Sequence, residues 1–274
     1  MYAAIDIGGT KTLVAVYDLK GNLKEDIKFP TPKNYDIFLI ELEKTVSQLS
    51  TTEFNNAVVA VPARLDRKNG IALAFGNLEW ENISIGPDIE KILHCPVTIE
   101  NDAKLAALSE AILVLPDYRK ALYVTISTGI GAGLVVDGTL EPNLLDLEAG
   151  QMLLEYNGKL RDWEDFGSGR AFQQKFGVRV GEMDENNGAA WYWLARNIAI
   201  GLIDLMATLT PDIVIIGGGA GAHLAKFSDR LDEQLKIYEN PMFAIPPVVG
   251  AQNAEKAVVY GCYELAKQFH QKRS

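Results

Sequence analysis

The sequence predicts two α/β lobes that enclose a cleft, and three observations lead to this fold class. Strand-like and helix-like segments alternate along the 274 residues without a long linker or a low-complexity stretch. The opening unit, in which two short apolar strands flank a glycine-rich turn, recurs at residues 121–136. Between the two copies, Pro116 and Asp117 interrupt the pattern. We therefore expect a duplicated scaffold, with residues 1–116 and 257–274 in a small lobe and residues 117–256 in a large lobe.

The first lobe opens with three short runs rich in β-branched and aliphatic residues. They are Ala3–Ile7, Thr12–Tyr17 and Leu23–Phe29, with turn residues between them. This pattern predicts a three-stranded antiparallel meander. Helices and strands then alternate, at Tyr35–Leu49 (helix), Ala57–Val61 (strand), Gly86–Leu93 (helix), Pro96–Ile99 (strand) and Asp102–Leu113 (helix).

The second lobe repeats the opening unit with the strands Ala121–Ile126 and Ala132–Val136. Helical periodicity follows at Glu164–Phe176 and Ala189–Leu209. The strand Ile213–Ile216 leads into a glycine triplet and a helix that ends near Lys236, and a last helix is predicted over Glu255–Gln268. Predicted helices therefore accompany strands in both lobes.

The composition excludes several classes of protein. The chain carries 26 basic and 36 acidic residues, a net charge of −10, and this argues against a nucleic-acid binder because such proteins need a basic face. Cys95 and Cys262 are isolated, which excludes a disulfide framework. No apolar run reaches the roughly 18 residues of a membrane span. The N-terminus has no signal-peptide pattern, so we expect a cytoplasmic protein without membrane contact.

The first glycine-rich turn follows a strand and contains Asp6, Gly8, Gly9, Thr10 and Lys11. Glycines allow backbone amides to approach an anion, and the threonine hydroxyl can add a hydrogen bond. The spacing is not that of a Walker loop. A phosphate site and a plain hairpin turn are both compatible with this segment.

Two more glycine-rich segments also lie at strand ends. The second combines hydroxyls with glycines over residues 125–133, and its key residues are Thr128, Gly129 and Gly131. The third is Gly217, Gly218 and Gly219, where an adenine or ribose could approach the backbone. The triplet is equally compatible with a tight turn from strand to helix. The first and second glycine-rich turns, in equivalent places of the two lobes, would be able to clamp one polyphosphate.

An acidic segment lies between a predicted strand and a predicted helix. It reads Glu100-Asn101-Asp102-Ala103. Asp102 at this place is either an N-cap of the helix or a catalytic carboxylate. Its expected position at the mouth between the lobes, beside an asparagine that can donate to and accept from sugar hydroxyls, favours catalysis.

Taken in their order along the chain, these motifs resemble those of the ROK family of sugar kinases and repressors. Residues 6–11 resemble the first phosphate motif of the family, residues 125–133 the second, and residues 212–219 the adenosine motif. The resemblance covers nearly the whole chain, and the ordered set is specific although each motif is short. It implies an actin/hexokinase-like, ribonuclease H-like fold of two duplicated α/β domains.

The resemblance also implies roles for individual residues. Asp102 is implied as the general base that contacts the sugar hydroxyl, and Asn101 as a sugar ligand. Similar segments imply further sugar ligands, at Asn77, Glu148, Gln151 and Glu164. ATP and Mg²⁺ are the implied cofactors, with Asp6 near the magnesium, directly or through water, and with the three glycine-rich segments around the nucleotide.

This chain departs from the family pattern at the zinc site. The histidine that would help to hold a structural zinc is replaced by Gln151, no cysteine lies between Cys95 and Cys262, and the following loop is short. We therefore expect no zinc. The apolar residues expected to anchor the shortened loop are Leu153, Leu154, Tyr156, Leu160 and Trp163. Ala60, Ala63 and Ser127 also stand where glycines are usual.

The predicted function is the transfer of the γ-phosphate of ATP to a hexose hydroxyl. The expected acceptor is O6 of glucose or of a related hexose or N-acyl hexosamine. The alternative is a catalytically weak, sugar-sensing regulatory protein without a DNA-binding domain, since the first strand begins at Tyr2. Polyphosphate as donor is a minor alternative, because the acidic chain offers no basic groove. A homodimer is a further expectation from the resemblance.

Overall fold

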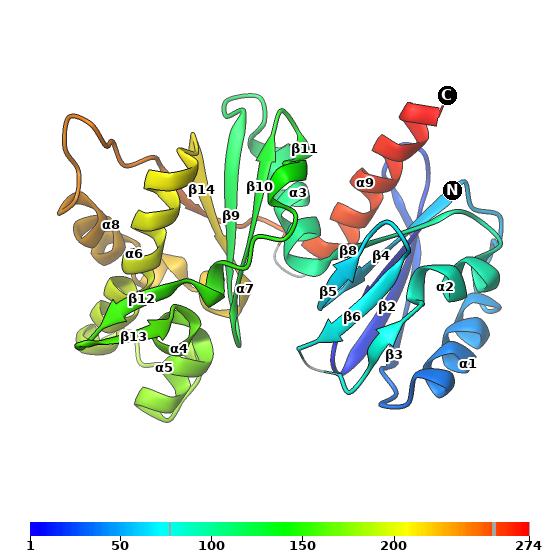
Figure 1. The fold of residues 1–274 in the computed structure, drawn as a ribbon, viewed down its shortest axis with the longest axis horizontal. Coiled ribbons are helices and arrows are strands. Elements are labelled where there is room, and N and C mark those ends of the chain that lie inside the picture. The colour runs from blue at the N-terminus through cyan, green and yellow to red at the C-terminus, as the bar shows by residue number, and fades with distance from the viewer. Residues whose placement is uncertain (77, 254–255, 274) are drawn as a thin grey trace. The chain divides into compact units, whose positions relative to one another are not determined.

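The computed structural model describes residues 1–76, 78–253 and 256–273 of the chain. Its contacts divide it into two compact units, one formed by Met1–Ser109 with Glu255–Ser274 and the other by Glu110–Ala254 (Figure 1). Helix α3 (Asp102–Val114) contains the first division point. The lobe limits expected from the sequence, at residues 116/117 and 256/257, stay a prediction.

The first unit contains a five-stranded sheet in the order β3-β2-β1-β4-β8. Its strands are β1 (Tyr2–Ile7), β2 (Lys11–Tyr17), β3 (Leu23–Pro30), β4 (Asn56–Val61) and β8 (Val97–Asn101). Strand β2 is antiparallel to β1 and β3, whereas β1, β4 and β8 are parallel. The predicted meander is therefore confirmed, and the crossovers to β4 and β8 contain helices.

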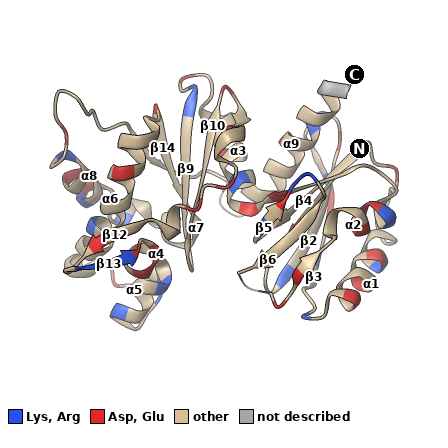
Figure 2. Ribbon diagram, in the orientation of Figure 1, with Lys and Arg blue, Asp and Glu red and all other residues tan. Residues whose placement is uncertain are grey.

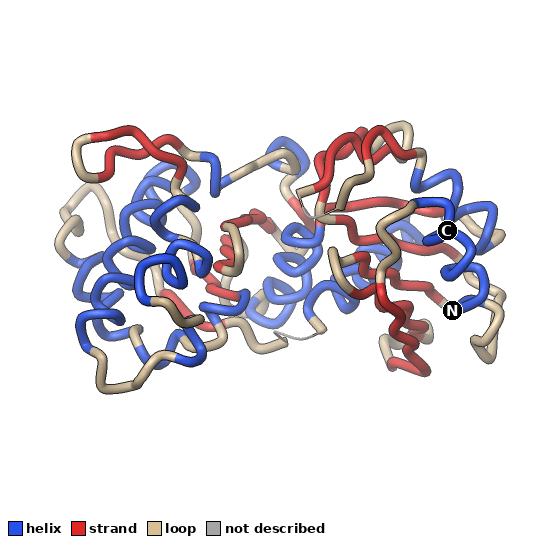
Figure 3. The backbone as a smooth tube through the Cα atoms, turned by 90° about the horizontal axis from the view of Figure 1, so that it is seen from below, coloured by secondary structure: helices blue, strands red, loops and turns tan. Residues whose placement is uncertain are grey.

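Helices cover both faces of this sheet (Figure 3). Ile5 and Val14 face α1 (Tyr35–Val46) and α2 (Ile85–Leu93), whereas the alternate residues Ala4 and Ala15 face α9 (Ala257–Arg273). This alternation follows from the two-residue repeat of a strand. A small antiparallel sheet completes the unit, with β5 (Ala63–Asp66), β6 (Ile71–Phe75) and β7 (Glu81–Ile83).

The second unit repeats the same sheet topology, in the order β11-β10-β9-β14-β15. The strands are β9 (Lys120–Ile126), β10 (Ile130–Val136), β11 (Thr139–Leu140), β14 (Ile213–Gly217) and β15 (Val248–Gly250). Strands β9 and β10 are antiparallel, and β9, β14 and β15 are parallel. The repeat detected in the sequence is thus a repeat of topology, and the predicted fold class is confirmed.

The helices of the second unit pack around a core of aliphatic and aromatic side chains. They are α4 (Glu164–Gly167), α5 (Gly169–Phe176), α6 (Gly188–Leu209), α7 (Gly218–Gly221) and α8 (Ser228–Lys236), with short 3-10 helices at Pro142–Leu144, Ala149–Gln151, Val180–Glu182 and Leu224–Lys226. Trp163 is completely buried, and its Nε1 donates to the carbonyl of Asn197 at 3.0 Å. Gly201 on α6 lets the helix approach this ring closely. Trp163 is therefore a core residue.

Several sequence predictions need correction. The helix predicted over Glu164–Phe176 is two helices, because Ser168 interrupts it and its Oγ accepts the Ala171 N–H at 3.2 Å as the cap of α5. The helix predicted after the glycine triplet is likewise divided into α7, a 3-10 turn and α8. The small sheet of the first unit, β15 and the hairpin β12 (Leu153–Tyr156) with β13 (Lys159–Asp162) were not predicted.

Two of the apolar residues expected to anchor the shortened loop do not do so in the hairpin β12–β13. Leu153 is 65% exposed and Leu160 is 70% exposed, so neither anchors it. Leu154 and Tyr156 on the opposite face pack against the core, and the Tyr156 ring stacks on Phe166 at 4.2 Å between ring centres. The alternation of a two-stranded ribbon decides which residues are buried.

Charged residues of opposite sign share the same elements. Figure 2 shows acidic and basic positions together on α1, α2 and α8. Among the described residues, no helix has the length and apolar character required to cross a membrane.

Candidate active site

Two acidic residues of the first unit interact near the ends of their elements. Asp6 is the last residue but one of β1, and Asp102 is the first residue of α3. Burial raises the pKa of Asp6 to about 7, the negative charge of Asp102 contributes to this rise, and Lys28 opposes it. Burial also raises the pKa of Asp102, against the Ala103 N–H and the charge of Lys104. The unit thus places two desolvated carboxyl groups close enough to repel each other.

The hydrogen bonds at the start of α3 bear on the N-cap alternative. Asn101 Oδ1 accepts the Ala103 N–H at 3.0 Å, from two residues along the chain, which is the geometry of a cap. Asp102 Oδ1 accepts the same N–H at 2.8 Å, from the adjacent residue. The Asn101 side chain therefore has the place of a cap, and Asp102 is not the only acceptor for this N–H. This arrangement favours the catalytic hypothesis for Asp102.

The first glycine-rich turn has the geometry of a hairpin that a neighbouring strand holds in place. The Gly8 N–H donates to the Lys11 carbonyl at 3.0 Å, and the Thr31 hydroxyl donates to the Gly8 carbonyl at 2.8 Å. The Thr31 N–H donates to the Thr10 carbonyl at 3.1 Å. The hairpin interpretation is therefore correct for the local geometry. A contact of Gly9 or Lys11 with phosphate stays a prediction.

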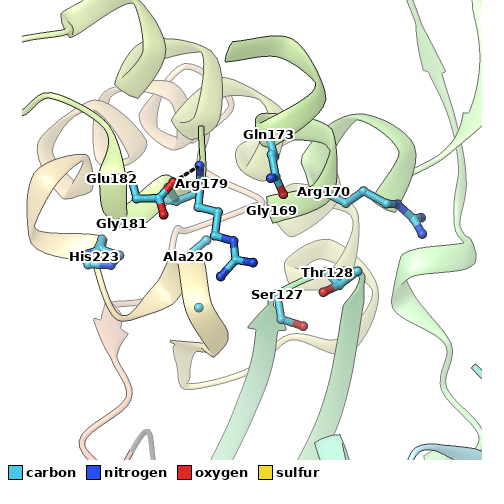
Figure 4. Close-up of a pocket in the computed structure, with 12 residues that line it drawn as sticks. Ser127, Thr128, Gly169, Arg170, Gln173, Arg179, Gly181, Glu182, Ala220 and His223 are labelled. Atoms are coloured by element: carbon cyan, nitrogen blue, oxygen red, sulfur yellow. Dashed lines mark hydrogen bonds between the residues drawn. The ribbon is translucent and has the colours of Figure 1, made fainter. Parts of the chain in front are cut away.

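In the second unit, the second and third glycine-rich segments border one pocket of about 590 Å³ (Figure 4). Thr128 comes from the turn between β9 and β10, and Gly219 from α7. The complete lining consists of Ser127, Thr128, Gly169, Arg170, Gln173, Arg179, Val180, Gly181, Glu182, Gly219, Ala220 and His223. Two segments far apart in the sequence thus line the same pocket, whereas Gly129, Gly131, Gly217 and Gly218 are not among the lining residues.

Five polar residues of this pocket were not assigned to it from the sequence. They are Arg170, Gln173, Arg179, Glu182 and His223. Figure 4 shows the Arg179 side chain extending into the pocket between Ala220 and Ser127. The His223 ring packs against Gly181, where a Cβ would lie 2.6 Å from Nε2. Of these five residues, only Arg170 and Gln173 could have been grouped from the sequence, because they lie three residues apart on the helix after Ser168 and so share one of its faces.

The adenosine-type turn depends on a glycine with a left-handed backbone. Gly218 has φ +78°, and a Cβ there would lie 2.5 Å from Thr125 Oγ1 and 2.7 Å from the Ile126 carbonyl oxygen. A Cβ on Gly219 would have no heavy atom within 4 Å. The first position is therefore restricted to glycine by the fold, whereas the second faces open space.

Glu164 and Gln151 meet beside the second glycine-rich turn. Gln151 Nε2 donates to Glu164 Oε1 at 3.2 Å, and the Ile130 N–H donates to Oε2 at 3.3 Å. Arg170 lies 3.5 Å from the same carboxylate. A Cβ on Gly129 would lie 2.5 Å from Glu164 Oε2, so the glycine makes room for the acid. These two predicted sugar ligands form one polar cluster.

The remaining predicted ligands are distributed differently. Glu148 is exposed and begins the 3-10 helix Ala149–Gln151. Asn77 lies outside the described residues. Ala60 and Ala63, which replace the usual glycines, are buried.

The side chains that commonly bind metal ions are dispersed in the described part of the chain. No group of three or more histidine, cysteine, aspartate or glutamate side chains lies close enough together there to hold an ion. The expectation that the protein contains no zinc stays a prediction.

Comparison with known proteins places the chain among sugar kinases. It is 27% identical over 298 residues to a fructokinase of Streptococcus mutans, with 98% of each chain covered. It is 28% identical over 263 residues to an N-acetylmannosamine kinase of Vibrio vulnificus, with 86% of this chain and 89% of the relative covered.

Its fold also matches the crystal structure of a ROK family glucokinase from Streptomyces griseus in complex with glucose and AMPPNP. The TM-score is 0.81 at 22% identity, with 97% of this chain and 99% of the other covered. The sequence profile of the ROK family matches residues 2–269. The chain belongs to the ROK family.

Proposed function

We propose that this ROK-family carbohydrate kinase transfers the γ-phosphate of ATP to a hexose hydroxyl, with Asp102 as general base. The acceptor in this proposal is O6 of glucose or of a related hexose or N-acyl hexosamine. The observation that carries it is the desolvated carboxyl of Asp102 at the start of α3, where Asn101 offers a second acceptor to the Ala103 N–H. Relatives of the chain are kinases of fructose and of N-acetylmannosamine, by their names.

Proton removal is the step assigned to Asp102. A carboxylate held in a poorly solvated place has a raised pKa and is a stronger base than one in water. It accepts the proton of the sugar hydroxyl as that oxygen attacks the γ-phosphorus and the bond to the β–γ bridging oxygen breaks. Because phosphoryl transfer depends chiefly on positioning and charge stabilisation, the other residues act by binding.

We assign the nucleotide to the pocket of the second unit. Its volume of about 590 Å³ lies within the range of small-molecule sites, which is roughly 300–1,000 Å³. Arg170 and Arg179 line it against one acidic residue, Glu182, so the charge of the lining suits an anion. Ser127, Thr128 and Gly219 are the motif residues at its wall. The resemblance to the family also assigns the glycine turn containing Gly8 to Lys11 to the phosphates.

Magnesium is consistent with the residues around Asp6. Burial and the charge of Asp102 raise the pKa of Asp6 to about 7, and a nearby cation would relieve this repulsion. Carboxylate oxygens are ligands that Mg²⁺ accepts, often through water. When bound, Mg²⁺ supplies positive charge for the phosphate oxygens. Asp6 is the residue that would hold it.

We assign sugar binding to Asn101, Asp102, Glu148, Gln151 and Glu164, on the resemblance to the family motifs. Glu164 still has hydrogen-bond capacity, because a carboxylate accepts about four bonds and this one receives few. Gln151 can donate and accept, where the family pattern has a histidine. Asn77 belongs to this assignment by resemblance.

The test is the substitution Asp102→Asn, assayed by ADP release over a panel of hexoses. Asparagine keeps the shape but accepts no proton, so kcat is expected to fall roughly 10²- to 10⁴-fold. Circular dichroism and ATP binding should match the wild type. If the variant keeps more than about a third of wild-type turnover, the base assignment is wrong. If the wild type releases no ADP with any hexose but binds one, the sugar-sensor alternative holds.

A further inference from the structure

An arginine in the turn between β5 and β6 contacts the segment that carries Asp102. Arg67 donates from Nε to Glu100 Oε2 at 2.8 Å and from Nη2 to Glu100 Oε1 at 2.7 Å. The Glu100 side chain is only 5% exposed. Two parallel charge-assisted hydrogen bonds fix the carboxylate in orientation as well as in place. Arg67 belongs to no motif recognised in the sequence.

Glu100 in turn holds the backbone that leads into α3. Its Oε1 accepts the Asn101 N–H at 2.7 Å. Asn101 and Asp102 then share the Ala103 N–H as acceptors, at 3.0 Å and 2.8 Å. Hydrogen bonds therefore connect the guanidinium of Arg67 through Glu100 to Asn101, and the side chain of Asn101 binds the first turn of the helix that begins with Asp102.

The turn that carries Arg67 is itself firmly held. Asp66 accepts the Asn69 N–H at 3.2 Å and Asn69 Nδ2 at 2.7 Å, which closes the turn. The Gly86 N–H donates to the Gly70 carbonyl at 2.9 Å, and a Cβ on Gly86 would lie 3.1 Å from Gly70. This close approach fixes the turn against the first turn of α2. The guanidinium thus extends from a backbone with little freedom.

We propose that Arg67 is a positioning residue for phosphoryl transfer: it fixes Glu100, and Glu100 fixes Asn101 and Asp102 in the geometry required for proton removal. The inference rests on the proposed function, in which Asp102 is the base. Without Arg67, a buried carboxylate would lack its cationic partner and would move toward water or toward another donor. A displacement of about 1 Å at a catalytic group can lower the rate about 10²-fold.

The first test compares Arg67→Met with Lys68→Met. Both variants lose one positive charge from the same turn, and Lys68 is exposed, which makes it the matched control. For Arg67→Met, we expect kcat to fall roughly 10- to 100-fold. The KM values for ATP and hexose should change far less, because Asp102 acts on the transferred proton. Lys68→Met should keep wild-type kcat.

The second test is rescue by Glu100→Gln in the Arg67→Met background. Glutamine keeps an acceptor for the Asn101 N–H but carries no charge that needs a partner. The double variant is therefore expected to recover part of the kcat lost in Arg67→Met. If the ion pair only stabilised the fold, its loss in Arg67→Met would lower Tm. The value of kcat would then be unchanged at a temperature where every variant is folded.

The outcomes separate this inference from the proposed function. If Arg67→Met turns over like Lys68→Met while Asp102→Asn is inactive, the positioning role is wrong and the base assignment stands. If Asp102→Asn keeps its turnover, the proposed function fails, and the positioning role fails with it. Should Arg67→Met not fold, Arg67→Lys keeps the charge and loses the paired geometry, and wild-type kcat in that variant overturns the proposal.

Discussion

At the scale of single residues, the pair Asp6 and Asp102 links stability to pH. The pKa of Asp6 is raised from 3.8 to about 7, so the folded protein retains a proton that the unfolded chain releases. The contribution of Asp6 to the free energy of unfolding is complete below pH 3.8 and declines as the pH rises to about 7. Asp6→Asn has no proton to lose. Its Tm relative to wild type should therefore increase between pH 5 and pH 8, in ligand-free protein with chelator.

Asp102→Asn provides the control for this prediction. It removes the second negative charge, which is the next cause after burial of the raised pKa of Asp6. In this variant the pKa of Asp6 should be lower, so the decline in the free energy of unfolding that Asp6 causes should end at a lower pH. A difference in Tm between Asp6→Asn and wild type that does not depend on pH would contradict the assigned pKa.

Glu164 allows a second prediction at the scale of a residue. If its carboxylate accepts sugar hydroxyls, Glu164→Gln should raise the KM for hexose by roughly 10- to 150-fold, the equivalent of about 1.5–3 kcal/mol for a charged hydrogen bond. The KM for ATP should change much less, and Glu148→Gln should act in the same direction. Asp165→Asn, at the exposed neighbouring position of α4, should leave both constants unchanged. Equal effects of Glu164→Gln on both substrates would contradict the assignment.

At the scale of elements, the turn between β14 and α7 provides a matched pair of substitutions. Gly218→Ala forces a side chain into the left-handed region and against the Ile126 carbonyl, so we expect a loss of at least about 1–2 kcal/mol in the free energy of unfolding. Gly219→Ala meets nothing within 4 Å and should keep the wild-type Tm. Denaturant titration measures both, and equal stability of the two variants would show that the turn does not require glycine at position 218.

At the scale of the whole molecule, metal dependence separates folding from catalysis. Elemental analysis of the purified protein is expected to show no stoichiometric zinc, because Gln151 and the short loop offer neither histidine nor thiolate. EDTA should leave Tm unchanged and should abolish phosphoryl transfer by removing magnesium. The hairpin β12–β13 is held by the packing of Leu154 and Tyr156. About one zinc per chain, or a Tm that falls in chelator, would overturn this expectation.

The sequence alone determined the fold class and the order of the motifs. Two-residue alternation and helical periodicity are local signals, so the strands Tyr2–Ile7 and Lys11–Tyr17 and their counterparts in the second unit were found almost to the residue. Glycines at strand ends likewise indicated the turns. At Gly218 the backbone has a positive φ, which favours glycine, and the residue type therefore indicates the turn. Family membership followed from the ordered set.

Only the tertiary structure decided which side chains meet. Arg67 and Glu100 are 33 residues apart, and nothing in their spacing indicates that one holds the other. Arg179 lines the pocket from the start of a 3-10 turn, and His223 lines it from the segment just after α7. The positions at which these short helices begin and end depend on packing as much as on helix propensity. The exposure of Leu153 and Leu160 also depends on the hairpin register. Such contacts depend on the three-dimensional path of the chain, so a local sequence pattern does not predict them.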